Sequence, residues 1–192
     1  MEQKAFFQNM NECTGCRCCQ VACKDKNDLE VGFLFRKVTD FEGSAFPDVW
    51  SASLSMGCNH CDSPACVANC PQGALYKEEK HGFVLQDHDL CIGCQTCVNS
   101  CPYGAPVYFP EENKTRKCDG CIDWVENGML PAYVGACSTR CLDFGTAEAG
   151  RIYYTTTTTA AQESVKMSAP FEAESAEQST PATEVSFEKY SH

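Results

Sequence analysis

The cysteines of this chain fall into four short groups, and their spacing constrains the fold more than any other feature. The chain has 192 residues and 17 cysteines. Two of the groups fit the template C-x2-C-x2-C-x3-C, which reads CIGCQTCVNSCP in the third group. The second group, CNHCDSPACVANCP, is a stretched form of this template. The groups are Cys13, Cys16, Cys19 and Cys23, then Cys58, Cys61, Cys66 and Cys70, then Cys91, Cys94, Cys97 and Cys101, and finally Cys118, Cys121, Cys137 and Cys141.

This spacing indicates metal ligands and argues against a disulfide scaffold. Cysteines two or three residues apart cannot easily join distant loops, and an odd total leaves one thiol over. Residues 1–10 also show neither the basic nor the apolar region of a signal peptide. Cys18 lies inside the first group but outside its template. We interpret it as a packed surplus thiol, with a redox role as the alternative.

The template predicts [4Fe–4S] clusters. Its first three cysteines surround one concavity, and the fourth binds a second cluster in two-cluster ferredoxins. Pro71 and Pro102 directly follow the last cysteine of their groups, as in that pattern. Structural zinc also takes four thiolates, but only the fourth group has a layout near that of zinc sites. A Rieske centre needs two histidines. Because only His60 lies near a cysteine group, we interpret it as an uncoordinated loop residue.

Other features narrow the function further. The net charge of −11 argues against nucleic-acid binding, and no apolar run approaches the length of a membrane span. No nucleotide-binding or catalytic motif is visible. The basic residues Lys114, Arg116 and Lys117 are interpreted as a solvated face, with a docking contact or a tuner of cluster potential as the alternative. The sequence therefore predicts a protein that conducts electrons and has no catalytic residues.

Short elements are expected around the cysteine loops. Strands are predicted at residues 5–10, 32–41, 49–56 and 82–87, and helical turns at 20–28 and 67–75. Gly15, Gly93 and Gly120 lie between cysteines, where the backbone must wrap closely around an inorganic core. Residues 155–192 are rich in Thr, Ala, Ser and Glu. We expect them to be disordered alone, with an arm that orders on a partner subunit as the alternative.

The segments CTGCRCCQVACKD, CNHCDSPACVANCPQGAL, CIGCQTCVNSCPYGAP and KCDGCIDWVENG, followed by LDFG, resemble a known family. They are similar to the four-cluster electron-transfer (beta) subunit of the dimethyl sulfoxide reductase family of molybdopterin oxidoreductases, over about residues 5–145. The resemblance implies an α+β fold of two ferredoxin-like dicluster units, one nested in the other. The outer unit takes residues 1–47 and 107–150, the inner unit takes 48–106, and 151–192 form an extended or disordered tail.

The resemblance also implies ligand sets. One cluster takes Cys58, Cys61, Cys66 and Cys101. A second takes Cys91, Cys94, Cys97 and Cys70. A third takes Cys13, Cys16 and Cys19 with a ligand from the fourth group, and the last takes Cys23 with ligands from the fourth group. In some relatives a tryptophan at the position of Cys97 costs the cluster an iron, so Cys97 predicts a full cubane here.

The fourth group departs from the family pattern. Counted from Pro131 and back from LDFG, the third-cysteine position holds Tyr133 and the fourth holds Cys137. The cluster held by Cys118, Cys121 and Cys23 would then have one weak corner. It would be a three-iron form, have an unusual ligand such as Tyr133, or be missing. In the other register, Cys137 and Cys141 are third and fourth, which needs an insertion and a compensating loss. We prefer the substitution, and expect three complete clusters and a fourth that is incomplete or absent.

The resemblance implies partners as well. These are a large catalytic subunit with a molybdenum or tungsten pterin and, in many complexes, a membrane anchor that handles quinol. Such complexes are often exported by a signal on the catalytic subunit, so either the cytoplasm or the outer face of the membrane fits a chain with no visible signal peptide. Two alternatives remain at this point. One is a freestanding polyferredoxin, or the cluster subunit of a cytoplasmic hydrogenase or formate-linked complex. The other is a zinc-binding interaction module.

Overall fold

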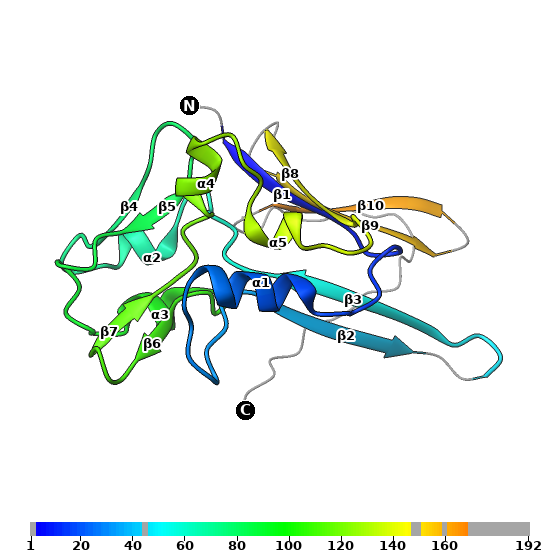
Figure 1. Ribbon diagram of the computed structural model, residues 1–192, viewed down its shortest axis with the longest axis horizontal. Coiled ribbons are helices and arrows are strands. Elements are labelled where there is room, and N and C mark those ends of the chain that lie inside the picture. The colour runs from blue at the N-terminus through cyan, green and yellow to red at the C-terminus, as the bar shows by residue number, and fades with distance from the viewer. Residues whose placement is uncertain (1–2, 44–45, 147–150, 159–160, 169–192) are drawn as a thin grey trace, which may run out of the picture.

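The computed structural model describes residues 3–43, 46–146, 151–158 and 161–168, the last two ranges as backbone only. Short helices and strands alternate along the chain (Figure 1). In chain order they are β1 (Lys4–Asn9), α1 (Cys18–Lys26), β2 (Lys37–Gly43), β3 (Trp50–Met56), α2 (Ala65–Ala68), β4 (Leu75–Lys77), β5 (Val84–Gln86), α3 (Thr96–Ser100), β6 (Val107–Phe109), β7 (Lys114–Arg116), α4 (Ile122–Glu126), α5 (Ala132–Gly135), β8 (Leu142–Thr146), β9 (Arg151–Thr158) and β10 (Ala161–Ser168).

One sheet joins the two ends of the cysteine-rich region. Its strand order is β10-β9-β1-β8. Strands β1 and β8 are antiparallel with Phe6 opposite Phe144, whereas β1 and β9 are parallel. Helix α1 also contacts α5. Segments from the beginning and the end of the cysteine-rich region are therefore packed together.

Three antiparallel hairpins make up the rest of the strand structure. They are β2–β3, β4–β5 and β6–β7. The β2–β3 hairpin is the longest, and in Figure 1 it extends to the right, away from the two small hairpins at the left. Helix α2 contacts α3 and β4, so the helices that follow the second and third cysteine loops lie against each other.

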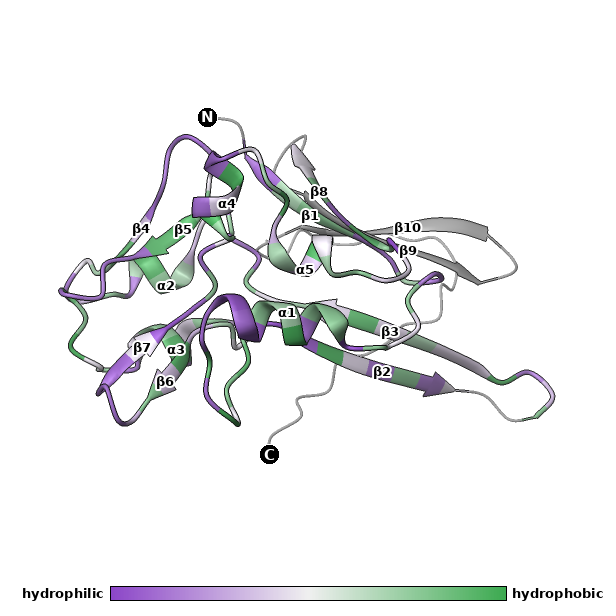
Figure 2. Ribbon diagram, viewed as in Figure 1, coloured by the Kyte–Doolittle hydropathy of each residue, from purple (hydrophilic) through white to green (hydrophobic). Residues whose placement is uncertain are grey.

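The hydrophobic core is divided into several small clusters. Phe6, Phe83, Tyr133 and Leu142 belong to one cluster, and Phe109 belongs to another. Figure 2 shows the hydrophobic residues spread over short stretches of many elements, such as α1, β3 and β5. Buried cysteines are members of three of these clusters. Small cores of this kind contribute limited stability on their own, so bound cofactors would add to the stability of the fold.

Most of the predicted elements are present. Strands β1, β3 and β5 and helix α1 lie at or within two residues of their predicted positions, and β2 covers the second half of its predicted segment. Helix α2 differs, because it lies at Ala65–Ala68 and ends before Cys70. Pro71 follows Cys70, and the residue before a proline is disfavoured in the helical region. None of the helices in the described ranges is long and apolar enough to cross a membrane.

The C-terminal region is extended where the structure describes it. Residues 151–158 and 161–168 form the antiparallel strands β9 and β10, within the segment predicted to be an extended or disordered tail. The run Thr155–Thr159 supplies β-branched residues, which favour extended backbone. The remainder of the predicted tail, residues 169–192, lies outside the described residues.

Candidate metal centres

The cysteine loops of the first and third groups have the same backbone conformation. Gly15 and Arg17 have φ values of 65° and 61°, and Gly93 and Gln95 have values of 70° and 59°. Arg17 and Gln95 are also the N-cap residues of α1 and α3. A Cβ at position 15 would lie 2.7 Å from Ser53 Oγ, so this left-handed position also lacks room for a side chain. The tight turn therefore recurs in the two loops that share the cysteine template.

Four cysteines from the second and third groups line one pocket. Cys91, Cys94 and Cys97 come from the loop before α3 and from α3 itself, and Cys70 follows α2. Thr115 of β7 also lines the pocket, with its Oγ1 3.5 Å from the Sγ of Cys91 and 3.4 Å from that of Cys97. We call these four cysteines the Cys91 site. They surround a hollow beside a hydroxyl that can donate a hydrogen bond to sulfur.

Cys58, Cys61, Cys66 and Cys101 form a second set, the Cys58 site. Burial raises the pKa of the Cys61 thiol to about 11, and the neighbouring Cys58 and Cys101 raise it further. Burial also raises the pKa of Cys66 to about 11; Cys58 adds to the shift and Lys117 opposes it. The thiols of this set therefore disfavour one another's ionisation. Cationic metal would be needed to hold them all as thiolates.

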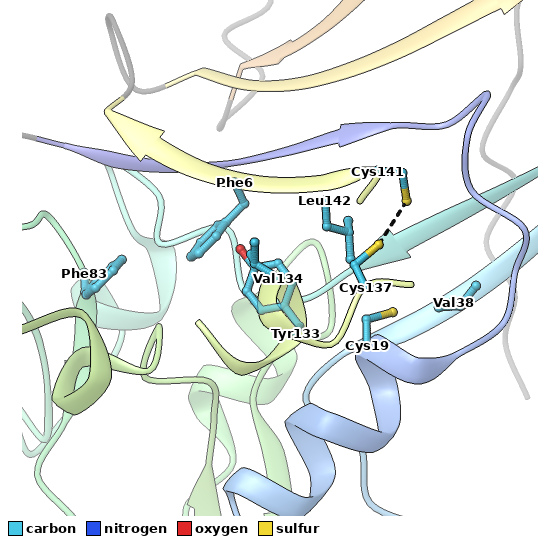
Figure 3. Packing of buried hydrophobic residues seen from close by; sticks show 9 residues of the cluster. All are labelled: Phe6, Cys19, Val38, Phe83, Tyr133, Val134, Cys137, Cys141 and Leu142. Carbon is cyan, nitrogen blue, oxygen red and sulfur yellow. Dashed lines mark hydrogen bonds between the residues drawn. The ribbon is translucent and has the colours of Figure 1, made fainter. Parts of the chain in front are cut away.

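The Cys13 site combines the first and fourth groups, and comprises Cys13, Cys16, Cys19, Cys137 and Cys141. Cys19, Cys137 and Cys141 are buried in one cluster, where Figure 3 shows the 3.5 Å contact between the Sγ atoms of Cys137 and Cys141. Cys13 packs against the same cluster, and Cys16 Sγ lies 3.5 Å from Ser138 Oγ. Burial raises the pKa of Cys141 to about 12, to which its hydrogen bond with Cys137 contributes.

Cys23, Cys118 and Cys121 form the Cys23 site. Burial raises the pKa of Cys23 to about 11, Arg36 opposes the shift, and Cys121 adds to it. The pKa of Cys118 lies well above its usual range because of burial, with Cys23 and then Cys58 contributing. Cys118 also packs against the hydrophobic cluster that contains Cys23. Cys58 acts electrostatically on the Cys118 thiol, which connects this set to the Cys58 site.

Tyr133 lies in α5, in the hydrophobic cluster that also contains Cys19, Cys137 and Cys141. Its ring centroid lies 5.7 Å from that of Phe6, and the guanidinium carbon of Arg36 lies 3.7 Å from the Tyr133 centroid. Only 4% of the Tyr133 surface is exposed. In Figure 3 the ring lies among the hydrophobic residues, apart from the Cys137 and Cys141 pair. Position 133 therefore carries a packed aromatic side chain, while Cys137 and Cys141 lie together at the Cys13 site.

Comparison with known proteins identifies the family. A family model of 4Fe–4S dicluster domains matches residues 50–147. The probable anaerobic dimethyl sulfoxide reductase subunit YnfG of Escherichia coli (strain K12) is 44% identical over 154 residues, which cover 76% of this chain and 75% of that protein. The B subunit of anaerobic dimethyl sulfoxide reductase from the same strain is 44% identical over 151 residues, covering 74% of this chain and 73% of that protein. This chain therefore belongs to the iron–sulfur subunits of the dimethyl sulfoxide reductase family.

Two predictions are thereby confirmed for this iron–sulfur subunit. Its cofactors are 4Fe–4S clusters, and it is an electron-transfer subunit without a catalytic role. The B subunit of the Haemophilus influenzae dimethyl sulfoxide reductase is more distant, at 38% identity over 165 residues, and the match covers 81% of this chain and 80% of that protein. The family resemblance identified from the cysteine motifs is therefore correct.

Two buried cations fit an anionic cofactor. Lys117 is 7% exposed and Arg36 is 6% exposed. The Nζ of Lys117 donates to the backbone oxygen of Cys118 at 2.6 Å, and Arg36 Nη1 donates to the oxygen and Oγ of Ser55 at 2.9 and 3.1 Å. In the described part of the chain, neither forms an ion pair with a carboxylate. Buried charges require compensation, and iron–sulfur clusters bound by thiolates would supply it.

The cysteine sets differ from a site for a single ion. Among the described residues, no three His, Cys, Asp or Glu side chains are grouped as they would be around one metal ion. A cubane has four irons and holds its cysteine sulfurs farther apart than one zinc ion does. The cysteine sets are therefore too widely spaced for a single ion, and this spacing is compatible with clusters of several irons.

Some predicted features need correction, and some residues were missed. The solvated-face interpretation is wrong for Lys117, because its side chain is buried. The other two basic residues make polar contacts: Lys114 donates to the His88 backbone oxygen at 2.6 Å, and Arg116 pairs with Glu112 at 3.3 Å. No sequence signal indicated Ser55, Arg36 or Thr115 as neighbours of cysteines.

His60 and Cys18 occupy different environments. His60 is completely buried, and its Nδ1 accepts a hydrogen bond from the Val84 N–H at 2.9 Å. Burial lowers the pKa of His60 well below its usual range, and Lys117 adds to this effect, so the ring is neutral. Cys18 is exposed at the start of α1. It is therefore not packed in the core as expected for a surplus thiol.

Proposed function

We propose that this subunit relays electrons between a molybdopterin catalytic subunit, with molybdenum or tungsten, and a membrane anchor that handles quinol or another redox partner. The relatives named above are subunits of anaerobic dimethyl sulfoxide reductases, which supports a catalytic partner for this chain. The metal, the anchor and export together with a signal-bearing partner come from the family resemblance. When bound, iron–sulfur clusters accept and release single electrons.

In this proposal the cysteines act as iron ligands in four sets. The Cys13 site uses Cys13, Cys16, Cys19 and Cys137. The Cys23 site uses Cys23, Cys118 and Cys121. The Cys58 site uses Cys58, Cys61, Cys66 and Cys101, and the Cys91 site uses Cys70, Cys91, Cys94 and Cys97. The mutual effects on thiol pKa and the pocket at the Cys91 site support these sets.

The observation that carries the proposal is a series of links between neighbouring cysteine sets. Cys19 and Cys23 lie one turn apart on α1, which links the Cys13 site to the Cys23 site. The influence of Cys58 on the Cys118 thiol links the Cys23 site to the Cys58 site. Contact between α2 and α3 links the Cys58 site to the Cys91 site. A continuous row of redox centres is what electron transfer across a subunit requires.

The two ends of this row are nearest to solvent. Cys16 of the Cys13 site and Cys94 of the Cys91 site are exposed, whereas Cys23, Cys58 and Cys121 are buried. Electrons that enter at one end and leave at the other would pass through the buried sites between them. We therefore propose that one partner docks near Cys16 and the other near Cys94.

We also propose that the row is built on two nested dicluster units. Pairing of β1 with β8 and contact of α1 with α5 support an outer unit from residues 1–47 and 107–150. Contact of α2 with α3 supports an inner unit from residues 48–106. Each unit would then pair two cysteine groups, as two-cluster ferredoxins do.

The relay can be tested in a complex with a tagged catalytic subunit and an anchor subunit. We expect the chain to co-purify with the catalytic subunit. Replacing an interior ligand, Cys58→Ser, is expected to stop turnover driven by quinol but to spare turnover driven by a reduced viologen dye, which can reduce the catalytic subunit directly. Cys18→Ser is the matched control and should leave both activities intact. Purification of the protein as a stable monomer, without a catalytic subunit, would instead favour a freestanding polyferredoxin.

A further inference from the structure

Arg36 is a buried cation that lies just before β2 and contacts Ser55 of β3. Only 6% of Arg36 and 2% of Ser55 are exposed. The Nη1 of Arg36 donates to the backbone oxygen of Ser55 at 2.9 Å and to its Oγ at 3.1 Å. Among the described residues, Arg36 pairs with no carboxylate. A buried charge is costly without compensation, so an anionic group is expected nearby.

The arginine and the serine are both held in place by other elements. The guanidinium carbon of Arg36 lies 3.7 Å from the centroid of the Tyr133 ring, whose face attracts the cation. Gln8 of β1 holds the serine, since its Oε1 accepts the backbone N–H of Ser55 at 2.8 Å and its Nε2 donates to the backbone oxygen of Ser53 at 2.9 Å. All five residues are buried. Packing and hydrogen bonds therefore fix Arg36 and Ser55 relative to each other.

The hydroxyl of Ser55 reaches one of the predicted iron ligands. Its Oγ lies 3.2 Å from the Sγ of Cys19, which belongs to the same cluster as Tyr133 (Figure 3). A thiolate that binds iron has no proton, so it can only accept a hydrogen bond from the serine. On its other side, the Oγ accepts the N–H of Arg36. The hydroxyl proton is therefore directed at the sulfur, and donation from a cation to the Oγ strengthens this second bond.

We propose that Arg36 is a positioning residue, which raises the reduction potential of the cluster at the Cys13 site by orienting the Ser55 hydroxyl toward Cys19. This inference rests on the proposed relay, in which Cys19 binds iron at that site. A hydrogen bond to a ligand sulfur favours the reduced cluster, because the reduced cluster carries more negative charge. The guanidinium charge acts in the same direction. Arg36 thus makes the Cys13 site a better electron acceptor.

The test is a redox titration followed by EPR on the anaerobically purified complex. It compares the wild type with Arg36→Met, Ser55→Ala and the double variant. The signal that shifts in Ser55→Ala identifies the cluster at the Cys13 site. We expect Arg36→Met to lower the equilibrium constant for reduction of this cluster by about threefold to tenfold, and tenfold corresponds to about 59 mV for a one-electron couple. An unchanged potential in Arg36→Met would overturn the inference.

The double variant separates orientation from charge. In Ser55→Ala the backbone oxygen of residue 55 still accepts from Arg36, so the charge stays in place. If Arg36 acts through the hydroxyl, its replacement matters less once the hydroxyl is gone. The fall in potential in the double variant should therefore be smaller than the sum of the two single falls. A fall equal to that sum would mean that Arg36 acts by charge alone, and would overturn the inference.

Two further variants complete the test, including the case in which Arg36→Met does not fold. Arg36→Lys keeps the positive charge, but lysine is shorter than arginine and has no planar group to lie on Tyr133. We expect a lowered potential at the same cluster, and a potential equal to that of the wild type would contradict a role in orientation. Arg116→Met is the matched control, because Arg116 also lies over an aromatic ring, that of Phe109, at 4.9 Å. It should leave the potential of the Cys13-site cluster unchanged.

Failure of this inference can be distinguished from failure of the proposed relay. Iron and acid-labile sulfide are measured in every preparation beside the titration. Additive shifts with iron and sulfide at the wild-type level would overturn the role of Arg36 and leave the relay in place. Absence of iron and sulfide from the wild-type complex would overturn the relay itself.

Discussion

Replacing Thr115 with valine should lower the reduction potential of the cluster at the Cys91 site. Thr115 is 2% exposed, and its Oγ1 lies 3.5 Å from the Sγ of Cys91 and 3.4 Å from that of Cys97. A sulfur that binds iron can only accept a hydrogen bond, so the hydroxyl is the donor. The reduced cluster carries more negative charge and accepts this bond more strongly, so the bond favours reduction.

The size of the shift follows from the strength of one buried hydrogen bond. Such a bond contributes about 0.5–1.5 kcal/mol net. For a one-electron couple, about 59 mV corresponds to a tenfold change in equilibrium constant, or ~1.4 kcal/mol. Loss of the whole bond from the reduced state alone would lower the potential by roughly 20–65 mV. The oxidised cluster also accepts this hydrogen bond, although more weakly. We therefore expect a decrease in potential toward the lower end of this range.

The assay is a redox titration followed by EPR on the anaerobically purified complex. Valine keeps the β-branched shape that suits strand β7, so the fold should tolerate Thr115→Val. Thr115→Ser retains a hydroxyl and is the matched control, with a potential close to that of the wild type. An unchanged or higher potential in Thr115→Val, or a shift confined to another cluster, would refute the reasoning.

Three further predictions follow from the same contacts. Ser55→Ala should lower the potential of the cluster at the Cys13 site by tens of millivolts in the same titration, because Ser55 Oγ lies 3.2 Å from Cys19 Sγ; a raised potential would contradict this. Lys117→Met removes a buried cation that acts on Cys66 and Cys118, so the reduction potentials of the clusters at the Cys58 and Cys23 sites should fall by tens of millivolts or more. Equal potentials in the wild type and the variant would contradict this. Cys18→Ser should leave iron content and EPR spectra unchanged, and loss of iron would make Cys18 a ligand.

The local parts of the sites could be predicted from the sequence. The cysteine template fixes the loop length, and Gly15 and Gly93 allow the left-handed turns that the structure contains. The prediction placed α2 too late because it gave too little weight to Pro71, which disfavours a helical conformation at Cys70. Short-range spacing and turn chemistry were therefore sufficient for the loops and for most of the strands.

Long-range contacts could not be predicted from the same patterns. Arg36 and Ser55 meet across the β2–β3 hairpin, and the hairpin brings Ser55 to Cys19 on α1. Lys117 resembles a surface lysine in the sequence, and only the packing around Cys118 buries it. Strand β9 pairs with β1 and β10 pairs with β9, and composition alone does not reveal this pairing.

The most direct test of the relay is the content of iron, acid-labile sulfide and zinc per copy of the subunit in the anaerobically purified complex. The account predicts about twelve to fifteen irons with a similar number of sulfides and no zinc, which corresponds to three four-iron clusters and a fourth that is incomplete or absent. Zinc without sulfide would contradict it, since four thiolates around a single ion conduct no electrons.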